Sequence, residues 1–130
     1  MRALQREHEA FFACDCRGAG ESRPDTCRAD SFFHSYGSDY HYASYALLLG
    51  ESYIAWRVHD LLSVLDWMAQ FRYDRIHLAC SGAGCVPGAL AALLDERVYR
   101  VTLIDAPASF EEMACNKLCS RPLSSMVSIQ

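Results

Sequence analysis

The sequence predicts an α/β fold, with parallel strands forming one sheet in a single domain, residues 1–130. Apolar strand-like segments alternate along the chain with helix-like segments, in the order strand, helix, strand, helix, strand. The clearest helix-like segment, residues 52–70, is followed by a strand, and a turn of small residues at 80–85 joins that strand to the next helix. This alternation is typical of parallel strands linked by right-handed helical crossovers.

The N-terminal half is expected to begin with a strand and a long loop. The strand covers 9–14, and the loop covers 16–38, where glycine and proline interrupt polar and aromatic residues. A short helix is expected at 39–49, with Asp39 as its N-cap and Gly50 as its stop.

Residues 52–70 carry the strongest helical pattern. Ser52 suits the N-cap, because its hydroxyl can accept a hydrogen bond from the first turn. Apolar residues then recur every three or four positions, which places them on one face of the helix. These residues are Ile54, Val58, Leu61, Leu62, Leu65 and Met68.

The C-terminal half is expected to contain two more strands. They cover 75–80 and 98–104, with a helix at 84–94 between them, and the second strand ends at Asp105. Residues 110–119 could form a further helix, and the last ten residues show no clear pattern.

Composition and charge narrow the possible partners. A net charge of −4 without any basic block argues against a nucleic-acid partner. No apolar run is long enough to cross a bilayer, and the first residues lack the apolar core of a secretory signal. We therefore expect no membrane partner and, for the sequence as it stands, a cytoplasmic protein.

The chain has seven cysteines. An odd number without a secretory signal predicts small buried thiols rather than a disulfide framework. The alternative is a zinc site, which would use Cys14, Cys16, Cys115 and Cys119. Because nothing in the spacing of cysteine and histidine requires a metal, we expect neither a metal nor a cofactor.

The turn at 80–85 is the strongest candidate for a catalytic element. In G-x-S-x-G enzymes, a sharp turn between a strand and a helix presents the nucleophile. One register of that motif puts Gly82 at the nucleophile position, and the other puts Ser81 there, between two alanines. Cys80 could instead act as a thiol nucleophile. The remaining alternative is a turn whose glycines serve only close packing.

The partners of such a nucleophile are less well marked. Asp105 follows a parallel strand, where it could orient a base or cap the next loop. His34 and His41 lie in an aromatic segment, residues 32–42, that could wall a binding cleft or could simply be a packed loop. His59 and His77 fall within a helix and a strand, where a structural role is expected.

A second motif follows the first strand, where Asp15 and Arg17 precede Gly18 and Gly20. The glycines permit a tight turn, and Arg17 could pair with a carboxylate or a carbonyl at the rim of the sheet. A nucleotide-binding loop is not favoured, because the third glycine and the following helix are both missing.

Taken in order, several motifs resemble α/β-hydrolases of the acetyl xylan esterase type over roughly residues 9–126. The motifs are Asp15-x-Arg17-Gly18-x-Gly20-Glu21-Ser22-x-Pro24, Tyr36-Gly37-Ser38-Asp39-Tyr40, Leu49-Gly50-Glu51-Ser52, Arg57-Val58-x-Asp60-Leu61-Leu62, Ala91-Ala92-Leu93-Leu94-Asp95-Glu96-Arg97-Val98 and Asp105-Ala106-Pro107-Ala108-Ser109-Phe110. The resemblance implies a three-layer fold and hydrolysis of small-molecule or carbohydrate esters by a Ser-His-acid triad, without cofactor.

The same resemblance implies departures from that family. It aligns Gly82, not Ser81, with the nucleophile, and it places the segment of Asp15 and Arg17, the expected structural rim, after the family's fourth strand. The third strand would precede Met1, and the acid and histidine of the triad would follow Gln130. The chain therefore resembles the central portion of a hydrolase domain with a degenerate elbow. Without the third strand, strand 9–14 would lack a neighbour, so we expect marginal stability and association through open sheet edges.

These observations leave two functions open. The first is an esterase-type hydrolase fragment that is inactive or incomplete by itself. If it is active, Ser81 is the expected nucleophile, with Asp105 and His34 or His41 as distant candidates for acid and base, and the oxyanion would bind backbone N–H groups near Gly82. The second is a non-catalytic binding module on a hydrolase scaffold, with the aromatic segment as its contact surface.

Overall fold

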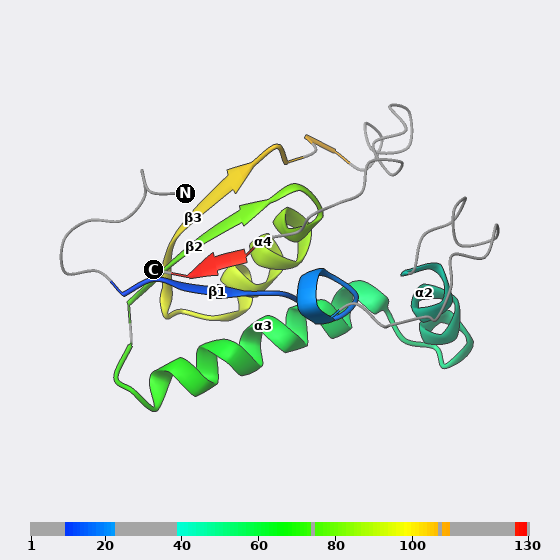
Figure 1. Cartoon of the computed structure of the whole chain (residues 1–130), viewed down its shortest axis with the longest axis horizontal. Coiled ribbons are helices and arrows are strands. Elements are labelled where there is room, and N and C mark those ends of the chain that lie inside the picture. Colours follow the sequence, from blue (N-terminus) through cyan, green and yellow to red (C-terminus); the bar gives the residue numbers. More distant parts are fainter. Residues whose placement is uncertain (1–9, 23–38, 74, 107, 110–126, 130) are drawn as a thin grey trace.

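The computed structural model describes residues 10–22, 39–73, 75–106, 108–109 and 127–129 (Figure 1). Its elements confirm the mixed α/β class. They are β1 (Phe12–Cys14), α2 (Asp39–Leu48), α3 (Tyr53–Ala69), β2 (Ile76–Ser81), α4 (Cys85–Leu94), β3 (Val98–Ile104) and β4 (Val127–Ile129), with short 3-10 helices at Gly20–Ser22 and Gly82–Gly84. The helix expected at 110–119 lies outside the described residues.

The four described strands form one sheet in the order β1-β4-β2-β3. β2 and β3 are parallel, as the alternation of strand and helix predicts. β4 is antiparallel to both of its neighbours, so the prediction of an all-parallel sheet is wrong. A three-residue strand is too short to show a hydrophobic period, which explains why the sequence pattern missed β4.

β4 also lies where a neighbour of β1 was expected to be missing. Ile129 pairs with Phe12 on one side and with Leu78 on the other. The expectation of an empty position between β1 and β2 is therefore wrong. Main-chain groups of β1 and of Leu78–Cys80 in β2 therefore have a partner strand between them, and this removes the reason for expecting marginal stability.

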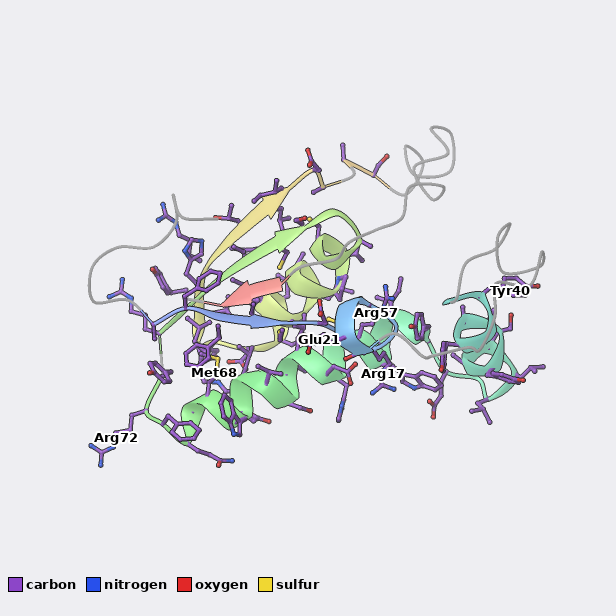
Figure 2. The ribbon with its side chains drawn as sticks, in the orientation of Figure 1. Arg17, Glu21, Tyr40, Arg57, Met68 and Arg72 are labelled. Atoms are coloured by element: carbon purple, nitrogen blue, oxygen red, sulfur yellow. The ribbon has the colours of Figure 1, made fainter. Side chains whose placement is uncertain are left out.

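The core lies between the sheet and α3. Ser52 caps α3 as predicted, since its hydroxyl accepts a hydrogen bond of 3.4 Å from the amide of Ala55. Met68 is buried and points from α3 toward the sheet, whereas Arg72, beyond the helix, points away from it (Figure 2). The fully buried side chains include Leu61, Leu65, Met68, Ile76, Leu78 and Cys80.

Ile54 is an exception to the predicted apolar face of α3. Its side chain is 39% exposed, although the helical period assigns it to the buried side. The first turn of α3 lies beyond the sheet, toward α2 (Figure 1), so that turn has no strand beneath it to cover an apolar side chain. At the end of α2, Gly50 adopts a φ of 73°, the left-handed conformation expected of a helix stop.

The helices α3 and α4 pack against one another, and α4 also contacts β2 and β3. Both helices therefore lie on the same face of the sheet. The three-layer arrangement expected of a hydrolase stays a prediction. Within the described part of the chain, no helix has the length and apolar character needed to cross a membrane.

Candidate functional site

In the turn after β2, Gly82 has an unusual backbone conformation. Ser81 is extended, with φ −133° and ψ 142°, whereas Gly82 has a φ of 57° and begins a single 3-10 turn that leads into α4. A positive φ is strained for any residue with a Cβ, and a nucleophile elbow places its serine at such a strained position. The backbone therefore has the shape of the register that puts Gly82 at the tip.

Cys80 is unsuited to act as a nucleophile. Its side chain is fully buried, and burial raises the pKa of its thiol to about 12, so the reactive thiolate is not populated at neutral pH. A Cβ placed on Gly88 of α4 would collide with the Cys80 sulfur. Gly88 thus allows α4 to lie directly on β2.

Among the described residues, no histidine is hydrogen-bonded to Ser81. Nε2 of His77 lies 2.8 Å from the hydroxyl oxygen of Thr102, and Nδ1 of His59 lies 3.5 Å from that of Ser63. Asp105 is exposed, with a φ of 54°. His34 and the side chain of His41 lie outside the described residues.

Asp105 lies close enough to α4 to act on Cys85. The pKa of the Cys85 thiol is raised by burial and, to a lesser extent, by the negative charge of Asp105. That thiol donates 3.4 Å hydrogen bonds to the carbonyl oxygens of Cys80 and Ile104. The acid is therefore at the carboxyl edge of the sheet, as predicted, with a thiol rather than an imidazole as its described neighbour.

The second motif forms a compact loop at the end of β1. The Asp15 carboxylate accepts a 3.1 Å hydrogen bond from the amide of Glu21 and lies directly against Gly20. Gly20 has a φ of 49°, and a Cβ there would overlap the Asp15 carboxylate. The glycine is thus required both for its backbone conformation and for the close approach of Asp15.

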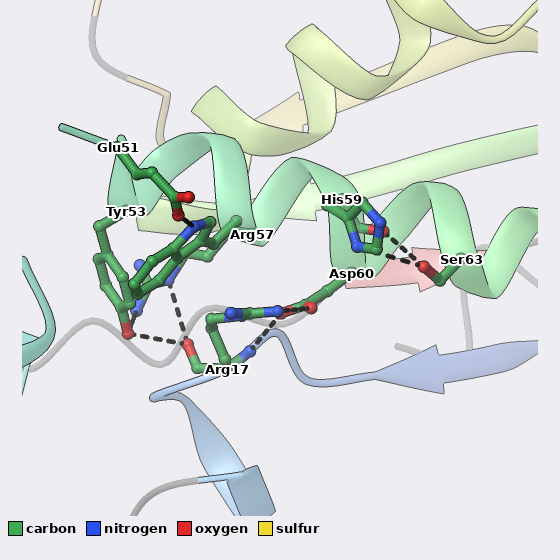
Figure 3. A network of polar contacts seen from close by, with 8 residues as sticks. Arg17, Glu51, Tyr53, Arg57, His59, Asp60 and Ser63 are labelled. Atoms are coloured by element: carbon green, nitrogen blue, oxygen red, sulfur yellow. Dashed lines mark hydrogen bonds and ion pairs between the residues drawn. The ribbon is translucent and has the colours of Figure 1, made fainter. Parts of the chain in front are cut away.

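Arg17 binds a carboxylate on α3. Its Nη2 and Nε lie 2.5 and 2.8 Å from the two carboxylate oxygens of Asp60, and its amide donates a further hydrogen bond to Asp60 at 3.2 Å (Figure 3). Burial alone would raise the pKa of Asp60, but the hydrogen bonds from Arg17 outweigh it, so that pKa is lowered. The pair therefore remains ionised at neutral pH.

The main chain of Arg17 is held by α3 as well. Its carbonyl oxygen accepts hydrogen bonds from the hydroxyl of Tyr53 at 3.1 Å and from Nε of Arg57 at 3.2 Å (Figure 3). Its guanidinium lies over the ring of Trp56, 5.4 Å from the centroid, and Trp56 in turn donates to Glu51. Figure 2 shows Arg17 and Arg57 where the loop after β1 meets α3.

A cleft of about 490 Å³ lies beside this network. Tyr42 of α2 stacks on Tyr53 of α3, with 6.1 Å between ring centroids and 13° between ring planes. None of the elbow residues lines the cleft, which is formed by Asp15, Arg17, Gly18, Ser22, Tyr42, Tyr53, Trp56 and Asp60. The structure thus separates the strand–helix turn from the cleft.

Sequence reasoning assigned Asp15 and Arg17 to the rim but did not identify the other cleft residues. Asp60 was noted only as part of a motif, and Tyr53 and Trp56 fell outside the apolar face of their helix. The available signal was that Arg17 was expected to pair with a carboxylate, while Asp60 was a carboxylate for which the sequence named no partner. Tyr42 does lie in the aromatic segment that was expected to wall a cleft.

No metal site is found within the described residues, because no three of their His, Cys, Asp and Glu side chains cluster suitably. Cys14 and Cys16 are free thiols, and burial is the main cause that raises the pKa of each to about 11. Cys115 and Cys119, the other two cysteines of the alternative zinc site, lie outside the described part of the chain.

Comparison of the chain with protein-family models, with curated proteins and with solved structures finds no match. The turn at Gly82 and the cleft formed by the loop after β1, α2 and α3 are therefore the features that bear on function.

Proposed function

We propose that this chain is a non-catalytic binding module on an α/β-hydrolase scaffold of the acetyl xylan esterase type. The scaffold would be the three-layer fold of that family, and the cleft beside Arg17 and Asp60 would hold a small-molecule or carbohydrate ligand. The observation that carries the proposal is Gly82, which has the positive φ of an elbow residue but no side chain to attack an ester.

The chemistry of the neighbouring residues supports a lack of catalysis. Cys80 is buried with a raised pKa, and Ser81 occupies an extended position without a described histidine bonded to it. A hydroxyl without a general base loses most of its advantage as a nucleophile, since the alkoxide is not formed at neutral pH.

The composition of the cleft supports binding. Three aromatic rings, those of Tyr42, Tyr53 and Trp56, provide apolar faces, while Asp15 and Asp60 offer carboxylate oxygens that can accept hydrogen bonds from hydroxyl groups. The ion pair to Arg17 holds one of these carboxylates in place before a ligand arrives, which reduces the entropic cost of binding.

The catalytic part of the proposal is tested with a fluorophosphonate probe and with p-nitrophenyl acetate. We expect the folded chain to remain unlabelled and to hydrolyse the ester no faster than its Ser81→Ala variant. Labelling that disappears in Ser81→Ala would instead establish a serine hydrolase.

The binding part is tested by titrating xylo-oligosaccharides while following the NMR chemical shift of the Trp56 indole N–H, together with tryptophan fluorescence, to which Trp67 also contributes. Tyr42→Ala removes one wall of the cleft and is expected to weaken binding roughly tenfold, the effect of losing about 1.4 kcal/mol. Tyr45→Ala is the matched control, because Tyr45 is on the same helix but does not line the cleft. Equal affinities for the two variants would contradict the assignment of the cleft.

A further inference from the structure

We infer that two copies of this chain associate through the outer edge of β3, extending the sheet across a two-fold axis. β3 ends the strand order, and among the described strands it pairs only with β2. Every second residue of such a strand directs its N–H and C=O groups away from the sheet, where another strand can pair with them.

β3 has few of the features that normally protect an edge, and its one charge and its irregular pairing both lie in its first half. It has seven residues, contains no proline and carries a single charge, at Arg100. Its last two side chains, Leu103 and Ile104, are 43% and 45% exposed. The other end of the described sheet differs, because β1 has only three residues and offers little to pair with. The exposed apolar edge therefore lies at β3.

The pairing of β3 with β2 favours one register between β3 and the β3 strand of a second copy. Its pairing with β2 is irregular between Val98 and Arg100, and then regular up to Ile104. An axis perpendicular to the sheet keeps each side chain on its own face, so a residue must pair with one an even number of positions away. If the axis passes through the middle of the five regularly paired residues, Arg100 to Ile104, it lies at Thr102.

This register places apolar residues opposite one another on one face of the sheet and brings no like charges together. Val101 would lie opposite Leu103 of the partner subunit, and both belong to the face that α4 covers, since their β2 partners Leu78 and Cys80 are core residues. On the other face, Arg100 would lie opposite Ile104 of the partner subunit, so no charge meets a like charge. The two copies of Thr102 would face one another, a favourable cross-strand pair.

α4 adds apolar surface on the same side. The same two-fold axis places both α4 helices on one face of the extended sheet. α4 packs against β3, and three of its leucines at helical spacing remain exposed: Leu90 by 40%, Leu93 by 83% and Leu94 by 69%. An isologous contact that uses one patch twice is the commonest form of association for a single chain. A second copy is therefore the occupant that fits this edge.

The inference is independent of the proposed binding function. The cleft is formed by the loop after β1 together with α2 and α3, whereas the inferred contact involves β3, at the opposite end of the strand order. Loss of one is not expected to change the other.

The test is the molar mass of the full chain by sedimentation equilibrium from about 1 to about 200 µM, a range in which mass action reveals a dimer. We expect a dimer that dissociates on dilution. Leu103→Lys and Ile104→Lys, on opposite faces of β3, should each weaken it by roughly tenfold or more, because each puts a charge into the contact. Circular dichroism establishes whether each variant is folded. If one variant does not fold, the other is enough to test the contact.

The matched control is Leu48→Lys on α2, at a leucine that is 82% exposed and remote from β3 in the sequence. It should leave the dimer unchanged. The register is tested by mild oxidation of Thr102→Cys, followed by peptide mapping, which should find position 102 of one subunit linked to position 102 of the other. A monomer at all concentrations, a dimer insensitive to both β3 substitutions, or one lost in Leu48→Lys would overturn the inference.

Discussion

The guanidinium of Arg17 meets both carboxylate oxygens of Asp60, at 2.5 and 2.8 Å, across a sequence separation of 43 residues. This pair joins the loop after β1 to α3 and forms one wall of the aromatic cleft. A bidentate geometry fixes both partners more firmly than a single contact would. The pair therefore positions the rim of the cleft, and its contribution to overall stability is limited because the Arg17 side chain is 42% exposed.

Stability should fall in acid because two carboxyl groups have a lowered pKa in the folded chain. Hydrogen bonds from Arg97 lower the pKa of Asp95, and those from Arg17 lower that of Asp60 against the effect of burial. Each carboxylate therefore contributes stability that is complete above its unfolded pKa, near 3.8, and is lost as the pH falls through its lower folded pKa.

The measurement is the free energy of unfolding in urea from neutral pH down through this acidic range. Asp95→Asn and Asp60→Asn should each flatten the dependence on pH below the unfolded pKa, since each removes one titrating group. A wild-type free energy that stays constant throughout the acidic range would contradict the lowered pKa values.

Arg97→Ala should destabilise the fold more than removal of its exposed partner does. Arg97 donates to Asp95, whose side chain is 7% exposed, to Asp66, whose side chain is 73% exposed, and to the carbonyl of Leu65 at 3.2 Å. Removing the Arg97 side chain leaves a buried carboxylate with the main-chain N–H of residue 97, at 3.0 Å, as its remaining donor, at a cost of about 2–3 kcal/mol.

Asp66→Asn is the matched variant, and it should cost at most about 0.5 kcal/mol because its ion pair is exposed to solvent. Both values come from urea unfolding at pH 7. Equal costs for the two substitutions would show that burial of Asp95 does not determine the strength of this network.

Gly88→Ala should destabilise the contact between α4 and β2. The added Cβ would overlap the sulfur of Cys80, a side chain that is fully buried and cannot move aside freely. Overpacking of this kind costs about 1–3 kcal/mol. The double variant Gly88→Ala with Cys80→Ala should recover part of that loss.

Gly50→Ala is the control, because nothing lies within 4 Å of a Cβ at that position and only its φ of 73° is unfavourable. Its expected cost is about 1 kcal/mol, from backbone strain alone. Thermal unfolding gives the loss of stability in each of the three variants. A loss in Gly88→Ala that Cys80→Ala does not partly reverse would contradict steric overlap as its cause.

Four thiols should resist alkylation in the folded chain at pH 7.5. Cys14, Cys16, Cys80 and Cys85 all have a raised pKa, for which burial is the largest cause, so little thiolate is present. Iodoacetamide treatment with peptide mass spectrometry should find them unmodified until urea is added. Rapid native labelling of Cys80 would contradict its burial and would reopen its assignment as a nucleophile.

The local patterns of the sequence predicted most of the described elements. Strand 98–104 was predicted with its observed bounds. The helix predicted at 52–70 extends one residue beyond α3 at each end, and Ser52 is its N-cap as predicted. Such signals are local, because a helical period and a capping hydroxyl depend only on neighbours within a few residues. The same locality explains the error at Ile54, whose burial depends on how far the sheet extends beneath α3.

By itself the sequence determined the mixed α/β class and the order of strand and helix up to β3, and it left both Gly82 and Ser81 open as the tip of the turn after β2. The tertiary structure decided that β4 lies between β1 and β2, that Asp60 is the partner of Arg17, and that the cleft is separate from the turn at Gly82. Strand neighbours and ion-pair partners depend on which distant segments meet in space. The main-chain groups of a strand can pair with those of any other strand, and a guanidinium can pair with any carboxylate. The sequence of one segment therefore does not specify which strand or which carboxylate becomes its partner.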